Sequence, residues 1–211
     1  MSDTRSRLLI LALVGLAIAA CSAPPAVDPA GSAVSVPATS DTSSPSIGVA
    51  PSEPPPASAD GSAALDQAWA TASLTDVATG ETFRIADLAG SVVIVETMAI
   101  WCSNCLAQQR DVQAALARLP ADRVVYVVLD VDPNEDASSL AEYQQAHGFD
   151  GRYAIAGDDL ARALAADFGD QVLNPPSTPM LIVGTDGTVT PTDYGHKSAD
   201  DIVALAEAHG A

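Results

Sequence analysis

The chain has 211 residues, and 27 Asp and Glu against 9 Lys and Arg give it a formal net charge of −18 at pH 7. No cluster of basic residues accompanies this excess of acid, so nucleic acid is not expected as a partner, because phosphate backbones are bound by grouped Lys and Arg side chains. The acidic balance is typical of a soluble domain that is repelled by anionic surfaces, although it also suits a basic protein partner.

The N-terminus is predicted to be an export signal over residues 1–20. Arg5 and Arg7 provide a basic start, and the thirteen residues at 8–20 carry no charge. This run is too short for a bilayer-spanning helix, which needs roughly 20 apolar residues. It closes on Ile-Ala-Ala-Cys at 18–21, which resembles the lipobox of bacterial lipoproteins. That resemblance implies that Cys21 is lipidated and anchors the mature chain; the alternative is an ordinary secretory signal in which Cys21 has no role.

Residues 21–64 are predicted to form a disordered tether rich in Pro, Ala and Ser. The segment has no Lys or Arg, and its acids are Asp28, Asp41, Glu53 and Asp60. It cannot bury enough apolar surface to offset the entropy lost on ordering, and its prolines favour extended conformations. We expect it either to hold the following domain away from a membrane or to be an inert spacer.

Residues 65–211 are predicted to form one domain, which is long enough to bury a core of its own. Of the acidic and basic residues, 22 and 7 fall here, a net charge of about −15. β-Branched runs predict buried strands, and apolar residues three and four positions apart predict helices. The expected elements are a hairpin over 74–83, a helical turn at 85–88, a strand at 92–95, a helix at 103–119, a strand at 123–131, a helix at 137–147, a strand at 153–156, a helix at 158–168, a hairpin with strands at 180–183 and 188–190, and a helix at 199–209.

The order of these elements predicts the fold class. Strands that are joined through helices pair in parallel by right-handed crossovers, whereas the hairpin over 180–190 adds antiparallel pairing. The prediction is therefore an α/β fold in which a mixed central sheet has helices on both faces. The hairpin over 74–83 would be an N-terminal extension of this fold.

The chemistry is expected where the strand at 92–95 leads into the helix at 103–119. Cys102 and Cys105 are separated by two residues, a spacing that suits a reversible disulfide across one helical turn. Cys102 falls at the helix start, where unpaired N–H groups stabilise a thiolate, and Cys105 lies deeper. We therefore predict that Cys102 attacks, that Cys105 resolves the mixed disulfide, and that Trp101 packs over the site and shields it.

The cysteine pair also allows other interpretations. One Cys-x-x-Cys can be half of a zinc site, but such a site needs four ligands. The remaining candidates, His147, His196 and His209, are scattered singly along the chain. Neither a metal site nor a cofactor is predicted. Inert core cysteines would suit a cytosolic chain, whereas an exported chain meets oxidants that favour a disulfide.

Residues 74–205 resemble the thioredoxin-fold proteins of the TlpA/ResA type, which are extracytoplasmic thiol–disulfide oxidoreductases often tethered to membranes. The resemblance rests on Trp-Cys-x-x-Cys at 101–105 and on Thr178-Pro179 before an apolar strand. It implies a thioredoxin-like fold, a cis bond at Pro179, and substrate contacts from Trp101, Thr178 and Pro179. The alternative for Pro179 is a trans proline that opens a strand, where its missing N–H is tolerated.

The resemblance also assigns a role to Glu96, which interrupts an apolar strand six residues before Cys102. Thioredoxin-like proteins often have a buried carboxylate there, beneath the resolving cysteine, and it would accept the proton from Cys105. The alternative is a carboxylate at a strand end that reaches water. Gln108 departs from the family, because many ResA-type proteins have Glu at that position. The dipeptide at 103–104 is Ser-Asn rather than Gly-Pro or Glu-Pro, which leaves the redox direction open.

The predicted function is that of a lipid-anchored thiol–disulfide oxidoreductase in the cell envelope, outside the cytoplasmic membrane. Its partners would be the thiols and disulfides of exported proteins, such as cytochrome c precursors, and the family suggests a transmembrane reductase as electron donor. Three alternatives are a thiol peroxidase, which typically has Thr where Ala99 stands, a copper chaperone of the SCO type, and an inert adaptor. SCO proteins use Cys-x-x-x-Cys and a histidine at the place of residues 177–178.

Overall fold

The computed structural model describes residues 65–211. The predicted signal peptide at 1–20, the predicted lipidation site Cys21 and the predicted tether over 21–64 lie outside the described residues. Between residues 65 and 211, none of the helices has the length and apolar character needed to cross a bilayer.

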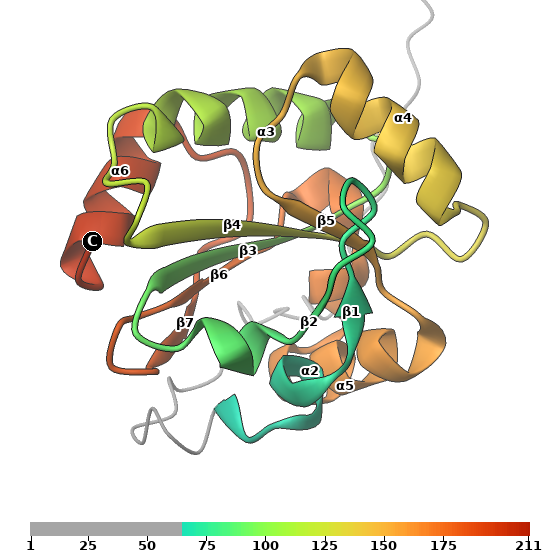
Figure 1. Ribbon diagram of the computed structural model, residues 1–211, viewed down its shortest axis with the longest axis horizontal. Helices are drawn as coiled ribbons and strands as arrows, with labels where there is room; N and C mark the ends of the chain where they lie inside the picture. Colours follow the sequence, from blue (N-terminus) through green and yellow to red (C-terminus); the bar gives the residue numbers. More distant parts are fainter. Residues whose placement is uncertain (1–64) are drawn as a thin grey trace, which may run out of the picture. The chain divides into compact units, whose positions relative to one another are not determined.

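A mixed sheet of five strands, in the order β5-β4-β3-β6-β7, forms the centre of the domain (Figure 1). β3 pairs in parallel with β4, and β4 pairs in parallel with β5, whereas β6 runs antiparallel to both β3 and β7. The predicted mixed sheet is therefore confirmed. The strands are β3 (Val92–Met98), β4 (Val124–Asp130), β5 (Arg152–Ile155), β6 (Met180–Val183) and β7 (Val189–Pro191).

Helices cover both faces of the sheet, as predicted (Figure 1). One face packs against α3 (Ser103–Leu116), α4 (Ala137–His147) and α6 (Ala199–Ala208). The opposite face packs against α2 (Ala68–Thr71) and α5 (Asp158–Phe168). Side-chain caps fix where α4 and α6 begin, because Asp136 accepts a hydrogen bond from the Ser139 N–H and Ser198 forms a capping box with Asp201.

The expected N-terminal hairpin is present as a separate two-stranded sheet. β1 (Leu74–Thr75) pairs antiparallel with β2 (Thr82–Phe83), and Gly80 adopts a φ of 72° in the turn between them. The Val77 N–H donates to the Tyr153 carbonyl, which attaches the hairpin beside β5. The short helix η1 (Ile85–Leu88) then leads into β3.

The seven residues of β3 are all buried, and their side chains alternate between two cores. Val92, Ile94 and Met98 belong to the core beneath α3, α4 and α6. Val93 and Val95 belong to the core against α2 and α5. Glu96 falls in the first of these two registers, so its carboxyl is directed into the core that also contains both cysteines.

Three short elements were not expected from the sequence: α2, η2 (Asp170–Leu173) and η3 (Pro175–Ser177). Each has only three or four residues, which is too few for a periodic apolar pattern to develop. The helix predicted over 103–119 ends at Leu116, and its last residues continue as turns up to Leu119. η3 matters most for the site, because it brings the chain against the first turn of α3.

Candidate active site

Cys102 occupies the N-cap position of α3, as predicted. Its backbone is extended, with φ −81° and ψ 106°, and its Sγ accepts a hydrogen bond from the Cys105 N–H at 3.2 Å. This position is usually filled by a side-chain oxygen that accepts from the first turn; here a sulfur takes that place. The arrangement stabilises negative charge on Cys102, because the free N–H groups of a helix start carry partial positive charge.

Cys105 lies one turn along α3 and is fully buried. Its Sγ donates to the Pro175 carbonyl of η3 at 3.3 Å. Burial raises the pKa of the Cys105 thiol, and its hydrogen bond with Cys102 raises that pKa further. Both cysteines are free thiols in this structure. The pair is therefore asymmetric, with one sulfur held as an acceptor and the other held as a protonated donor.

Cys102 is less accessible than a reactive thiolate was expected to be, since only 3% of its surface is exposed. Trp101, which was expected to pack over the site, is 61% exposed, and its Nε1–H donates to Asp132 Oδ2 at 2.6 Å. η3 lies close to the start of α3, where the Asn104 amide donates to the Pro176 carbonyl at 2.9 Å.

The Thr178-Pro179 loop lies beside the cysteines, as the resemblance implied. η3 leads directly into Thr178, and the Pro179 carbonyl accepts from the Thr97 N–H at 3.3 Å. The expected cis bond at Pro179 is wrong, because no peptide bond among residues 65–211 is cis. The chain reverses instead at Thr178, whose φ of 45° lies in the left-handed region that β-branched residues rarely adopt.

Thr178 is buried, and both of its main-chain polar groups are occupied. Its N–H donates to the Pro175 carbonyl at 2.8 Å, and its carbonyl accepts from Lys197 Nζ at 3.0 Å. Its hydroxyl oxygen is buried without a hydrogen-bond partner. The predicted contact of Thr178 with a substrate backbone stays a prediction, and it requires at least one of these groups to be freed or shared.

Glu96 is fully buried in the middle of β3, so the alternative of a strand-end carboxylate in water does not hold. Its Oε2 accepts from the Tyr126 hydroxyl at 2.5 Å, and its Oε1 has no partner. Burial raises the pKa of Glu96 to about 8, although the Tyr126 hydrogen bond and the charge of Lys197 both lower it. The charge of Glu96 in turn raises the pKa of Cys105, which places the two groups in electrostatic contact.

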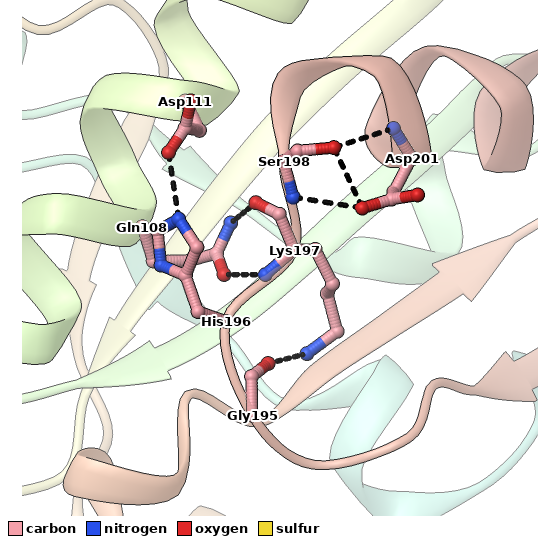
Figure 2. A network of polar contacts seen from close by, with 7 residues as sticks. All are labelled: Gln108, Asp111, Gly195, His196, Lys197, Ser198 and Asp201. Atoms are coloured by element: carbon pink, nitrogen blue, oxygen red, sulfur yellow. Dashed lines mark hydrogen bonds and ion pairs between the residues drawn. The ribbon is translucent and has the colours of Figure 1, made fainter.

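Lys197 is a site residue that the sequence analysis missed. It is the only lysine in the chain, and it is 7% exposed. Its Nζ donates to the carbonyls of Thr178 and Gly195, at 3.0 and 2.7 Å, and burial lowers its pKa. Figure 2 shows its main chain held by the Gln108 side chain. The available signal was a single lysine in a strongly acidic domain.

Two carboxyl groups near the segment before the cysteines, those of Glu135 and Asp130, were also missed. Glu135 Oε2 accepts from the Ile100 N–H at 2.8 Å. Asp130, at the end of β4, is fully buried, and its pKa is raised to about 8, first by burial and then by its hydrogen bond with Glu135. Its position after an apolar strand was visible in the sequence, but its burial was not. The Glu135 side chain therefore holds the loop that precedes Cys102.

The three histidines do not form a site with the cysteines. His196 Nε2 lies 2.7 Å from Asp111 Oδ2, while His209 contacts the Leu205 carbonyl and the Thr190 hydroxyl. His147 packs against the rings of Tyr143 and Phe149. Within residues 65–211, no three His, Cys, Asp or Glu side chains come together as a metal ion would require.

Comparisons with known proteins identify the fold. A thiol:disulfide interchange protein of the thioredoxin family from Chlorobium tepidum superposes with a TM-score of 0.57 at 20% identity, covering 76% of this chain and 99% of that one. A secreted Mycobacterium tuberculosis disulfide oxidoreductase homologous to E. coli DsbE gives 0.54 at 16%, covering 66% and 97%. MTB dsbF gives 0.52 at 18%, covering 66% and 96%.

The described domain has the thioredoxin fold. The predicted fold class, a thioredoxin-like mixed sheet with an N-terminal hairpin, is thereby confirmed. No family model and no curated protein matches the sequence. At identities of 16 to 20% the thioredoxin fold is what these structures share with the chain, so its chemistry has to be argued from its own residues.

Proposed function

We propose that this chain catalyses thiol–disulfide exchange, with Cys102 as the attacking thiolate and Cys105 as the resolving thiol. The observation that carries the proposal is the hydrogen bond from the Cys105 N–H to Cys102 Sγ at 3.2 Å, at the start of α3. This hydrogen bond favours a thiolate on Cys102, while burial keeps Cys105 protonated before the second displacement. The proteins of similar fold that are described as disulfide oxidoreductases add support.

Exchange proceeds in two displacements. The Cys102 thiolate attacks one sulfur of a substrate disulfide, forms a mixed disulfide, and releases the other substrate sulfur as a thiolate that takes a proton from water. Cys105 then loses its proton and attacks Cys102 Sγ, which forms the Cys102–Cys105 disulfide and releases the second substrate thiolate. Two electrons pass from the cysteine pair to the substrate, and the reverse sequence oxidises a substrate dithiol.

Glu96 is the proposed acceptor of the Cys105 proton. Only an ionised carboxylate can accept it, and with a pKa of about 8 Glu96 is largely protonated at pH 7. The second displacement should therefore accelerate as the pH rises toward 8 and then level off. The first displacement does not depend on Glu96, so the two steps should differ in their pH profiles.

The proposed setting of the reaction is based on the N-terminal sequence. The predicted signal peptide at 1–20 and the lipobox ending at Cys21 support a lipid-anchored enzyme outside the cytoplasmic membrane. One of the proteins with a similar fold is described as secreted. We propose that the substrates are disulfides of exported proteins, that the direction is reduction, and that a membrane reductase returns electrons to the cysteine pair.

Trapping of the mixed disulfide tests the mechanism. Cys105→Ala removes the resolving thiol, so substrate proteins should accumulate as adducts on Cys102 that are seen on non-reducing gels and released by dithiothreitol. Cys102→Ala is the matched control and should trap nothing. Absence of adducts with Cys105→Ala, or equal amounts with both variants, would overturn the exchange mechanism.

The anchor has its own test, which is independent of the chemistry. Cys21→Ser in the full chain should release the protein into the soluble fraction, whereas the wild type should stay with membranes. Membrane retention of Cys21→Ser would contradict lipidation at that residue without affecting the proposed exchange reaction.

A further inference from the structure

A hollow beside the site is not used by the exchange mechanism. It has a volume of about 550 Å³ and lies between α6 and the segment that follows β7. A volume of this size is within the range of ligand pockets. The Gly195 N–H donates to the Ser177 carbonyl at 2.8 Å, and Ser177 ends η3, whose Pro175 carbonyl accepts from Cys105. The hollow is therefore joined to the redox pair through one short segment of the chain.

An exposed aromatic ring lines this hollow. Tyr194 is 50% exposed, and the other exposed large hydrophobic side chain of the described domain is Trp101, next to Cys102. Tyr and Trp are enriched among the residues that carry most of the energy of protein binding, because their rings bury a large apolar area against a partner. The rest of the wall includes the apolar side chains of Pro191, Ala204 and Leu205.

Two carboxylates of the hollow keep free acceptor oxygens. Asp193 is exposed, and its carboxylate has no hydrogen-bond or ion-pair partner within residues 65–211. Asp201 accepts from the Ser198 N–H and hydroxyl, at 3.0 and 2.6 Å, with the same oxygen, Oδ2 (Figure 2). Its Oδ1 has no partner in the described part of the chain. The open polar groups of the hollow are therefore negative.

The basic side chains of the hollow do not offset these carboxylates, because each already has partners. Lys197 is buried, and its Nζ donates to the carbonyls of Thr178 and Gly195. The His196 ring is directed to Asp111 on α3, with 2.7 Å between Nε2 and Oδ2 (Figure 2). A ligand in the hollow therefore meets an apolar wall, an aromatic ring and carboxylate oxygens that lack a cation.

A basic side chain of a polypeptide matches this combination. Its apolar stem fits along Pro191 and Leu205, while its cationic head can contact the Tyr194 ring and the Asp193 carboxylate. We propose that the hollow is a subsite for the substrate polypeptide, and that it takes an Arg or Lys side chain a few residues from the substrate cysteine. This inference rests on the proposed exchange function and names its substrate class. The acidic excess of the domain favours the same substrates.

Peptides that carry one cysteine as a mixed disulfide with an aromatic thiol test the subsite on the full chain. Attack by Cys102 releases the aromatic thiolate, which absorbs light and leaves more readily than the peptide thiolate because its thiol has the lower pKa. Release of the peptide by Cys105, followed by mass spectrometry after acid quench, gives the second phase. Arg or Glu is placed two to five residues from the cysteine on either side. At adjoining positions on one side, the Arg peptide should react about tenfold faster in the first phase.

Variants of exposed residues locate the source of this preference. Asp193→Asn should reduce the ratio of Arg to Glu rates about fivefold. Tyr194→Ala should reduce it as well, whereas Tyr194→Phe keeps the ring and should retain it. Asp122→Asn is the matched control, because Asp122 is an exposed acid just before β4, at the end of the sheet away from the cysteines. It removes the same charge and should leave the ratio unchanged.

Binding can be measured apart from the chemistry with the same peptides carrying Ser in place of Cys. The Arg form should slow the first phase at a lower concentration than the Glu form, and Asp193→Asn should abolish this difference. A rate ratio near one in the wild type, or a ratio that Asp193→Asn and Tyr194→Ala leave unchanged, would overturn the subsite. Absence of thiolate release from every peptide would instead contradict the proposed exchange function.

Discussion

The two faces of the central sheet are built from the same strands but have different interiors. The face against α2 and α5 packs aliphatic and aromatic side chains such as Val93, Val95 and Leu164. The face beneath α3, α4 and α6 contains the two buried carboxyl groups of the sheet, Glu96 and Asp130. Alternation along β3 places Val95 and Glu96 next to each other in sequence but on opposite sides.

This difference indicates what the cysteine-bearing face has to do. Burial of a carboxyl group without charge compensation lowers the free energy of unfolding, and the fold itself does not require a buried carboxyl group. On the cysteine-bearing face Glu96 accepts a hydrogen bond from the Tyr126 hydroxyl, the charge of Lys197 lowers the pKa of Glu96, and the charge of Glu96 raises the pKa of Cys105. We infer that the face against α2 and α5 provides the stability of the domain. The cysteine-bearing face contributes less to stability because it keeps a proton acceptor near the resolving thiol.

The largest effect is expected when a carboxyl group is introduced on the face that packs against α2 and α5. Val95→Glu should lower the free energy of unfolding by about 3–5 kcal/mol, because a buried charge without a partner costs that much. Urea unfolding at pH 8 measures it, and Val95→Gln serves as the uncharged control. A loss below about 1 kcal/mol would mean that both faces accept a carboxylate equally, and the contrast between them would disappear.

Removal of the carboxyl from the cysteine-bearing face should impair chemistry instead of folding. Glu96→Gln keeps an acceptor for the Tyr126 hydroxyl but cannot take a proton, so the second displacement at pH 8 should slow by about 10²-fold, equivalent to about 2.7 kcal/mol. Two-phase kinetics should show an unchanged first phase. An unaffected second phase would assign the proton transfer to water.

The stability of the wild type should decrease as the pH rises. The pKa of Glu96 is about 8 in the folded chain and lies near 4 in the unfolded chain, so the folded state retains a proton that the unfolded state releases. The free energy of unfolding should therefore fall by about 2 kcal/mol between pH 6 and pH 8. Asp130, with its pKa also about 8, acts in the same direction.

Thermal unfolding over this pH range provides the measurement. Glu96→Gln should reduce the slope, and the double variant with Asp130→Asn should reduce it further. A slope of opposite sign in the wild type would mean that neither carboxyl is buried in protonated form.

The smallest effect is expected from the hydroxyl that bonds Glu96. Tyr126→Phe removes the hydrogen bond to Oε2, which favours the carboxylate and is worth about 1 kcal/mol. The pH midpoint of the second displacement should rise by less than about one unit, with the stability at pH 6 nearly unchanged. A midpoint that moves downward would show that the hydroxyl favours the protonated acid.

Much of the fold could be predicted because it depends on local patterns. β3 and β4 are continuous β-branched runs, and α4 and α5 begin and end at the predicted residues because Asp136, Gly157 and the glycines at 148 and 169 mark their ends. The position of Cys102 at the start of α3 could also be predicted, because this cysteine follows an apolar strand pattern and precedes a helical one.

The rest depends on contacts between residues distant in sequence. Lys197 lies 89 positions from Gln108 and 19 from Thr178 along the chain, and no periodic pattern reports those bonds. Thr178 is left-handed and the expected cis bond at Pro179 is absent, and the contacts of Thr178 with Pro175 and Lys197 join residues that no local pattern relates. The exposure of Trp101 likewise depends on its bond to Asp132, 31 residues away.

The reduction potential of the Cys102–Cys105 pair tests the central claim most directly. Equilibration of the full chain with glutathione buffers, followed by acid quench and mass spectrometry, should show one intramolecular disulfide forming in a two-electron transition. A reductant should have a potential near that of thioredoxin, about −270 mV, and a value near −120 mV would reverse the proposed direction. Glutathione adducts on Cys102 without any internal disulfide would contradict the paired mechanism altogether.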